Sequence, residues 1–248
     1  MPKSELERLN MCEEIPLTGG RITLGVVKKG NQVLRPLCTN STFVHDVLKW
    51  LEKKMVDLAP KFIGLTNDER EIISFLDGTS PDNIGWFSDN QLYEAGKIIK
   101  RLHDNLSDFP GCTDGKTVCH NDLSPCNFMF LNDLPYTVFD WDASTIDDPI
   151  NDIAYAIWLW LDIGFDDVYD DGCGPNTPSV IGKKAKIMLD AYGLEKEKRN
   201  ILIFKIYEQM QRVSFSTKLE NRMDAHEWAN NCEKWLRKYQ AEIVPYIK

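Results

Sequence analysis

The pattern of apolar and polar positions divides the chain into a β-rich part followed by a helical part. Up to about residue 78, short apolar runs alternate with glycine, proline and asparagine turns, which is typical of strands. A helical stripe with apolar residues three and four apart interrupts them and begins at Ser41-Thr42. The predicted strands are Ile22 to Val27, Gln32 to Arg35, Lys61 to Leu65 and Glu71 to Leu76, and the predicted helix runs from Ser41 to Met55.

Beyond this point the apolar positions recur mostly with helical spacing. One helix is predicted from Ser88-Asp89 to about His103, and a helix buried all round from Ile153 to Leu161. Three more are predicted at about 179–192, 198–218 and 223–246. Strands followed by helices predict an α+β fold with two lobes, 1–78 and 79–248, divided at a proline- and glycine-containing segment.

Between the helices lies a stretch, Val118 to Asp142, with a hairpin pattern of its own. Two apolar runs, Phe128 to Leu131 and Tyr136 to Phe139, are joined by four turn-forming residues. A hairpin brings the residues at its open end together, so Asn127 and Asp140 are expected to meet, with Asp122 facing the same place. An amide oxygen beside a carboxylate is an oxygen site suited to Mg²⁺. Turn chemistry alone also favours asparagine and aspartate here, but it does not account for the whole set at this spacing.

The composition of the chain limits the classes of partner and the compartment that can be expected for it. The net charge of −9 argues against a nucleic-acid partner, which needs a basic face, and is compatible with a cationic substrate. The first residues are charged and do not form a signal peptide, and no apolar stretch is long enough to span a membrane. Seven cysteines without a CxxC pair favour reduced thiols, so the cytoplasm is the expected compartment. The oligomeric state stays open.

The chemistry predicted for this centre is phosphoryl transfer to a hydroxyl. Asp122 is the expected catalytic residue, because a carboxylate can orient or deprotonate a substrate hydroxyl within hydrogen-bond reach. Asn127 and Asp140 are the expected ligands of a Mg²⁺ ion held against nucleotide phosphates. Positioning and charge neutralisation account for most of such catalysis.

The motif His120-x-Asp122-x-x-x-x-Asn127, with Asp140 after the hairpin, resembles the catalytic core of aminoglycoside phosphotransferases and choline kinases. These are relatives of the protein kinases, so the resemblance implies a two-lobed, protein-kinase-like fold. It also implies that ATP and Mg²⁺ are used and that Asp122 is the catalytic base. By the same resemblance His120 is a structural strut. Asp152 either anchors the backbone of the catalytic loop or only offsets the dipole of its helix.

The resemblance extends over about residues 14–215. Gly19 and Gly20 are similar to the family's phosphate-covering loop, and the stretch with Ser74, Phe75 and Leu76 is similar to the hinge that meets adenine. One feature departs from the family, because Arg35 stands where kinases have a lysine.

Near Arg35 and the metal site, two roles stay open. His45 is either the helical partner of Arg35, in place of a glutamate, or a half-buried helix residue. Asp142 either approaches a second Mg²⁺ or caps the turn.

The acceptor is expected to be a small molecule with a hydroxyl group, and an aminoglycoside-like acceptor is preferred. Acidic residues follow the catalytic stretch and could attract a polycation, although for Asp166 to Asp171 a solvated acidic loop is the alternative. Tryptophans in this part could stack on a quaternary ammonium, although their helical spacing is more typical of a core. The acidic residues are Asp147, Asp148, Asp162, Asp166, Asp167, Asp170 and Asp171, and the tryptophans are Trp158, Trp160 and Trp228.

Two alternatives remain. The first is a kinase of choline, homoserine, a macrolide or another metabolite. The second is a catalytically dead nucleotide-binding module on the same fold.

Overall fold

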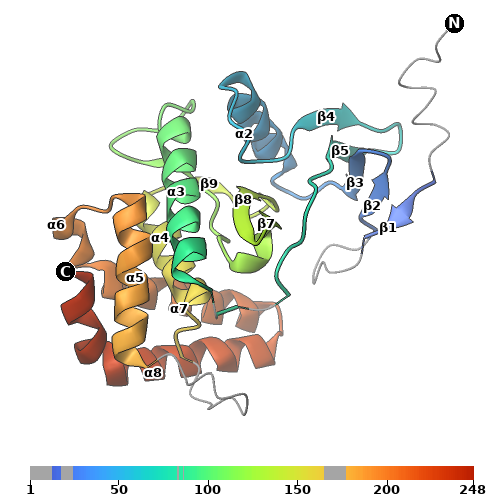
Figure 1. Cartoon of the computed structure of the whole chain (residues 1–248). Helices are drawn as coiled ribbons and strands as arrows, with labels where there is room; N and C mark the ends of the chain where they lie inside the picture. The colour runs from blue at the N-terminus through green and yellow to red at the C-terminus, as the bar shows by residue number, and fades with distance from the viewer. Residues whose placement is uncertain (1–12, 18–24, 83, 86, 165–176) are drawn as a thin grey trace, which may run out of the picture.

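The computed structural model describes residues 13–17, 25–82, 84–85, 87–164 and 177–248. A small antiparallel β lobe lies beside a larger, mainly helical lobe (Figure 1). This confirms the predicted two-lobed α+β architecture. The predicted boundary at 78/79 falls in the link between the last strand of the small lobe and the first helix of the large one, and stays a prediction.

The small lobe is a five-stranded antiparallel sheet with one helix. The strands lie in the order β1-β2-β3-β5-β4, so β3 and β5 are central. Helix α2, Ser41–Lys53, follows β3 and buries Val44, Val47, Leu48 and Leu51. The sheet contains β1 (Ile15–Pro16), β2 (Val27–Lys29), β3 (Gln32–Pro36), β4 (Phe62–Leu65) and β5 (Arg70–Ser74).

The large lobe is built from helices packed in pairs. Helix α3 packs on α5, α5 on α8, and α7 on both α8 and α4. Trp158 and Trp160 of α4 are completely buried in the core. None of the helices in the described part of the chain is both long and apolar enough to cross a bilayer. The helices are α3 (Asp89–Leu106), α4 (Pro149–Trp160), α5 (Pro178–Tyr192), α6 (Lys196–Arg199), α7 (Leu202–Leu219) and α8 (Met223–Ile247).

The predicted hairpin is present but its turn is shorter than expected. Strands β7 (Phe128–Leu131) and β8 (Leu134–Val138) are joined by two residues, Asn132 and Asp133, not four. Both have positive φ, 51° and 63°, as a type I′ turn requires. Pro135 is tolerated inside β8 because the register shifts beside it, between Met129 and Phe130 of β7.

Two short strands that were not predicted frame the catalytic stretch. Strand β6, Thr117–Cys119, pairs antiparallel with β9, Thr145–Asp147, and a single 3₁₀ turn, Pro125–Asn127, leads into β7. The β6–β9 pair closes residues 120–144 into one loop, so the polar residues of this stretch are held between fixed ends.

The link between the lobes passes close to the hairpin. Gly78 has a φ of +119°, and a Cβ atom there would lie 2.2 Å from the carbonyl oxygen of Phe130. Next to it, Thr79 and Phe130 exchange backbone hydrogen bonds of 3.1 and 2.7 Å. Only glycine allows the chain to approach β7 this closely.

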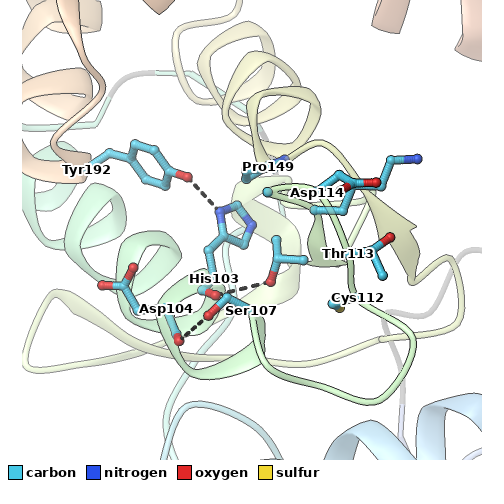
Figure 2. Close-up of a pocket in the computed structure, with 11 residues that line it drawn as sticks. His103, Asp104, Ser107, Cys112, Thr113, Asp114, Pro149 and Tyr192 are labelled. Carbon is cyan, nitrogen blue, oxygen red and sulfur yellow. Dashed lines mark hydrogen bonds between the residues drawn. The ribbon is translucent and has the colours of Figure 1, made fainter.

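A pocket of about 300 Å³ lies at the end of α3, between that helix, the loop 112–117 and Tyr192 of α5 (Figure 2). Its polar lining includes His103, Asp104, Thr113 and Asp114. Tyr192 contacts His103 Nδ1 at 2.9 Å, and the other nitrogen of His103 faces the anchor of the catalytic loop described next. The pocket therefore borders this anchor from the side of α3 and α5.

Candidate active site

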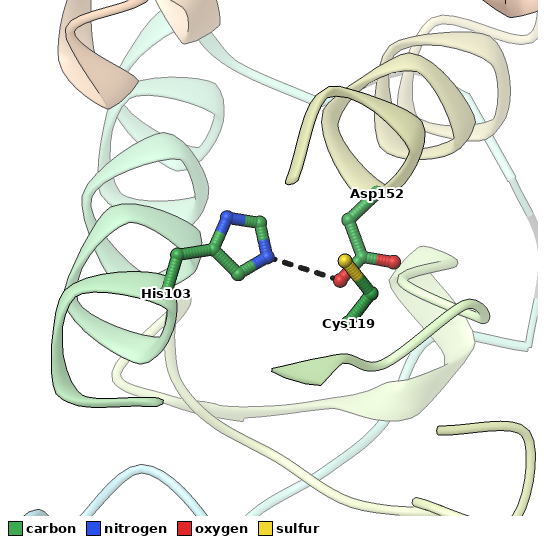
Figure 3. Close-up of side chains that lie close together, drawn as sticks. All are labelled: His103, Cys119 and Asp152. Atoms are coloured by element: carbon green, nitrogen blue, oxygen red, sulfur yellow. Dashed lines mark hydrogen bonds and ion pairs between the residues drawn. The ribbon is translucent and has the colours of Figure 1, made fainter. Parts of the chain in front are cut away.

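The backbone of the catalytic loop is held by one buried carboxylate. Asp152 of α4 accepts hydrogen bonds of 2.7 Å from the backbone N–H groups of both His120 and Asn121, and one of 3.1 Å from His103 Nε2 (Figure 3). Burial alone would raise the pKa of Asp152, but the hydrogen bond and charge of His103 and the bond from Asn121 hold it below its usual value. Of the two roles predicted for Asp152, the structure shows the anchor.

A second set of contacts orients Asp122 itself. The hydroxyl of Tyr155, one turn beyond Asp152 on α4, donates to Asp122 Oδ1 at 3.0 Å. Burial and the neighbouring Asp122 raise the pKa of Tyr155 well above its usual value, so the hydroxyl stays a neutral donor. From α7, Arg212 donates to the backbone oxygen of Asn121 at 3.0 Å and to its Oδ1 at 3.2 Å. Two helices, α4 and α7, thus position this carboxylate and the loop that carries it.

His120 links the catalytic loop to the end of β8, as a strut would. Its Nε2 donates to the backbone oxygen of Phe139 at 3.0 Å, and its Nδ1 accepts from the N–H of Asp122 at 3.3 Å. The imidazole also packs edge-on against Trp141. These contacts fix the distance between the catalytic loop and the end of β8.

Asn127 and Asp140 lie at the open end of the hairpin. The N–H of Phe139, the residue before Asp140, donates to the backbone oxygen of Asn127 at 2.9 Å. Asn127 Nδ2 donates to the backbone oxygen of Asp122 at 2.9 Å, so its side-chain oxygen is directed away from that bond. Partial burial and the charge of Asp142 raise the pKa of Asp140, and Asp122 adds to the effect.

This donor set fits Mg²⁺. Crowded carboxylates next to an amide oxygen are the hard ligands that Mg²⁺ prefers, and a divalent cation would relieve the repulsion among Asp122, Asp140 and Asp142. The φ of Asp140 is +63°, an uncommon backbone conformation that often occurs at functional sites.

Arg35 of β3 connects the small lobe to these acids. Its Nη2 forms an ion pair with Asp142, and its Nη1 lies 3.6 Å from Asp140 Oδ1. Asp142 is therefore the ion-pair partner of Arg35. Its two predicted roles, approach to a second Mg²⁺ and capping of the turn, stay predictions.

The other side of Arg35 faces a carboxylate that the sequence did not suggest. Arg35 Nε lies 2.8 Å from Oε1 of Glu71, an ion-pair contact in which the N–H is not aligned for a hydrogen bond. Oε2 of Glu71 lies 2.6 Å from His45 Nε2 of α2. Both Glu71 and His45 are buried. His45 thus contacts a glutamate of β5, not Arg35 directly.

The structure describes only some of the predicted nucleotide-binding residues. Gly19 and Gly20 lie outside the described residues. The N–H groups of Ser74 and Phe75 donate to the carbonyls of Lys61 and Asn31, both at 2.9 Å, so these donors are used within the small lobe. Leu76 follows directly and is partly buried. Adenine binding along this stretch stays a prediction.

The acidic residues proposed for acceptor binding have several roles. Asp147 accepts from Asn151 and from the N–H of Asp148, and Asp148 caps the N-terminus of α4. Asp162 is buried just after α4, and burial raises its pKa to about 6. The remaining four, in the range 166–171, lie outside the described residues.

The tryptophans belong to the core. Trp158 and Trp160 have no exposed surface, and Trp158 stacks on Trp228 with ring centroids 4.9 Å apart. Trp160 Nε1 donates to the carbonyl of Leu123 at 3.1 Å. Trp158 and Trp160 therefore do not form an aromatic cage for an ammonium group.

A second cluster of potential metal ligands lies behind the catalytic loop. One ligand atom from each of His103, Cys119 and Asp152 lies within 4.8 Å of the others. Burial strongly raises the pKa of the Cys119 thiol, and the oxygens of Asp152 already accept three hydrogen bonds. A protonated thiol and a saturated carboxylate are poor metal ligands, so this cluster is an anchor and not a metal centre.

Sequence reasoning missed Tyr155, Arg212 and Glu71. Tyr155 could have been found, because a residue three positions after Asp152 lies on the same face of a helix. Glu71 is an acidic residue at the start of an apolar strand, a pattern that signals a buried charge pair. Nothing in the sequence around Arg212 indicates its contact with residue 121, which is 91 positions away.

Comparison with known proteins agrees with this geometry. The model of the phosphotransferase enzyme family matches residues 108–180, which include the catalytic loop, the hairpin and α4. No curated protein sequence matches the chain.

Several solved structures share the whole fold at low identity. Choline kinase from Cryptosporidium parvum is 15% identical with a TM-score of 0.64, and the match covers 96% of this chain and 92% of that one. The aminoglycoside phosphotransferase APH(2″)-IIa in complex with gentamicin is 14% identical with a TM-score of 0.58, covering 98% and 99%. A structure of the same enzyme holds streptomycin and ATP. The GDP complex of aminoglycoside 2′-phosphotransferase-IIIa is 13% identical with a TM-score of 0.55, covering 92% of each chain.

The resemblance predicted from the catalytic motif is thereby confirmed. Residues 108–180 carry the pattern of the phosphotransferase enzyme family, and the chain as a whole has the two-lobed, protein-kinase-like fold of aminoglycoside phosphotransferases and choline kinases.

Proposed function

We propose that this chain is a small-molecule kinase that transfers the γ-phosphate of ATP to a hydroxyl group of its acceptor. The observation that carries the proposal is the constrained Asp122. Asp152 and Arg212 hold its loop, Tyr155 binds its carboxylate, and Asn127 and Asp140 lie beside it at the end of a hairpin. A side chain held from several elements is pre-organised for chemistry.

In the proposed reaction Asp122 orients the acceptor hydroxyl and accepts its proton as the hydroxyl oxygen bonds to the γ-phosphorus. The bond between the γ-phosphorus and the oxygen that bridges it to the β-phosphate breaks, and ADP leaves with the electron pair. Because Oδ1 of Asp122 already accepts a hydrogen bond from Tyr155, Oδ2 of Asp122 is the oxygen that receives the proton. Asn127 and Asp140 would hold Mg²⁺, which neutralises charge on the nucleotide phosphates when bound. Arg35 supplies a second cation beside Asp140, with terminal amines that match phosphate oxygens.

The nucleotide is proposed to be ATP, bound between Arg35, the hinge at 74–76 and the glycines at 19 and 20. Structures with this fold contain ATP, ADP or GDP, which supports a nucleoside triphosphate as the donor. A competition experiment between ATP and GTP decides which donor is used.

The acceptor is proposed to be aminoglycoside-like and cationic. The net charge of −9 favours a cation. Choline, homoserine and macrolides are the alternative acceptors. The cytoplasm remains the proposed compartment, in keeping with reduced thiols at Cys38, Cys112, Cys119 and Cys232.

Replacing Asp122 tests the reaction. Asp122→Ala is expected to lower turnover by at least about a thousandfold while nucleotide affinity stays within about threefold, because the residue contacts the acceptor and not the nucleotide. A coupled assay for ADP on a panel of aminoglycosides, choline, homoserine and macrolides, with and without Mg²⁺, gives the readout. Unchanged turnover in the variant would refute the assignment.

The same panel separates the enzyme from a catalytically dead binding module. Thermal stabilisation by ATP and Mg²⁺ without turnover on any acceptor would favour the module. The complete Asp122, Asn127 and Asp140 set supports the enzyme.

A further inference from the structure

Arg35 is the cation that faces the predicted nucleotide site, and its ion-pair partner in the small lobe does not come from the helix. Where the family resemblance predicts a lysine paired with a glutamate of the helix, this chain has Arg35 on β3 and His45 on α2. Two cationic or neutral nitrogen groups at these positions cannot form an ion pair with each other. A carboxylate must come from elsewhere.

That carboxylate is Glu71 on β5. Residues 35 and 71 are directly opposite each other in the register of the central strands. Glu71 is only 3% exposed, with one oxygen 2.8 Å from Arg35 Nε and the other 2.6 Å from His45 Nε2. His45 also stacks on Phe62 of β4, with ring centroids 3.9 Å apart, so its own position is fixed. One buried carboxylate therefore joins β3, β5 and α2.

The guanidinium group of Arg35 contacts the small lobe through Nε and the large lobe through Nη1 and Nη2. Nε faces Glu71 inside the small lobe, whereas Nη1 and Nη2 face Asp140 and Asp142 of the large lobe. A guanidinium anchored at Nε keeps its terminal amines in one plane and one direction. That direction leads to Asp142 and to Asp140, which is expected to hold Mg²⁺ against the nucleotide phosphates.

We propose that Glu71 is the positioning residue for Arg35 in the nucleotide site, and that His45 holds Glu71 in place from helix α2. Strand β5 thus supplies, as Glu71, the carboxylate that helix α2 lacks at His45. This inference rests on the proposed function, because it assigns Arg35 to the phosphates of a bound nucleotide. It is distinct from the chemistry of Asp122, which acts on the acceptor.

Replacing the carboxylate by an amide of the same shape tests the proposal. In Glu71→Gln the dissociation constant for ATP, measured by calorimetry with and without Mg²⁺, is expected to rise at least about tenfold, since a charged anchor is lost. KM for the nucleotide should rise in parallel, while KM for the acceptor stays within about twofold. A purely structural ion pair would change the melting temperature but leave the nucleotide affinity of the folded protein unchanged.

His45 provides the second pair of variants. His45→Gln keeps a donor that reaches Glu71 and is expected to bind ATP within about threefold of the wild type. His45→Leu removes the donor and is expected to follow Glu71→Gln. The matched control is Glu14→Gln, because Glu14 binds Arg70 of the same strand β5 on the exposed side of the lobe, and its loss should leave nucleotide binding unchanged. Circular dichroism verifies that each variant is folded.

Wild-type affinity for ATP in folded Glu71→Gln, or in folded His45→Leu if Glu71→Gln does not fold, would overturn the inference and leave the proposed function intact. Retained turnover in Asp122→Ala would instead overturn the proposed function. Failure of the wild-type protein to bind any nucleotide would overturn both.

Discussion

The residues of the candidate site are fixed by contacts that come from outside the catalytic loop. Asn121 is in the left-handed region with a φ of +63°, and its side chain donates to the carbonyl of Ala143 and to Thr145 Oγ1. Asparagine tolerates this conformation better than most residues. The adjacent Asp122 can therefore point toward Tyr155 while the N–H groups of residues 120 and 121 point toward Asp152.

At the residue scale, Tyr155→Phe should show that Tyr155 orients the carboxylate of Asp122 and does not contribute to substrate binding. The hydroxyl contacts only the carboxylate of Asp122 and not the expected nucleotide site, so kcat is expected to fall about tenfold, equivalent to about 1.4 kcal/mol, with KM values unchanged. Steady-state kinetics with saturating ATP and Mg²⁺ measure this. Tyr93→Phe, on the exposed face of α3, is the control. An unchanged kcat in Tyr155→Phe would show that the bond does not matter for turnover.

At the scale of elements, helix α4 is the organiser of the site. Asp148 caps its N-terminus, Asp152 holds the backbone of the catalytic loop from its first turns, and Tyr155 reaches the carboxylate one turn later. Its remaining faces are buried among apolar residues, and Trp160 bonds to the carbonyl of Leu123 in the same loop. A shift of this helix would move the contacts of Asp152, Tyr155 and Trp160 with the loop together.

The acid dependence of stability provides a test of this role. The pKa of Asp152 is lower in the folded protein than in the unfolded chain, so its contribution is complete above about pH 4 and is lost as the pH falls through the lowered value. Asp152→Asn is expected to lower the free energy of unfolding by about 3 kcal/mol at pH 7. The difference from the wild type should shrink below about pH 4.

Urea unfolding at several pH values measures the effect. The control is Asp148→Asn on the same helix, because asparagine is an equally good N-cap and stability at pH 7 should change little. A difference between Asp152→Asn and the wild type that stays constant from pH 7 to pH 3 would contradict the prediction.

At the scale of the whole molecule, the lobes are joined by polar contacts as well as by the chain. Asn40, just before α2, donates from Nδ2 to the backbone oxygens of Asp142 and Ser144 at 3.1 and 2.9 Å. Trp50 of α2 donates to the carbonyl of Asn105 at the end of α3, and Phe43 packs edge-on against Phe109. These contacts set the position of the small lobe relative to the segment that carries Asp142 and Ser144.

Removing the Asn40 side chain should loosen this arrangement. Asn40→Ala is expected to lower stability by about 1–2 kcal/mol, because two backbone carbonyls lose their partner. Amide hydrogen exchange followed by mass spectrometry should show faster exchange in residues 37–53. Asn67→Ala, in the exposed turn between β4 and β5, is the control. Exchange rates equal to those of the wild type in this range would argue that the lobes are held by other contacts.

Local patterns in the sequence determined the elements and the central motif. The apolar spacing of Leu92, Ala95, Ile99 and Leu102 correctly identified α3, and the alternation around Asn132-Asp133 identified the hairpin, because both depend on near neighbours in the chain. The turn was predicted two residues too long, since Pro135 suggested a loop. A register shift that depends on both strands accommodates it in β8.

Only the tertiary structure decided which charged groups pair. Arg35 and Glu71 are 36 positions apart and Arg35 and Asp142 are 107 apart, so neither pair leaves a trace in local periodicity. Which carboxylate a buried cation meets depends on strand register and on the packing of one lobe against the other. The sequence alone therefore indicated the residues that are proposed for the reaction centre, whereas the fold determined the contacts that position them.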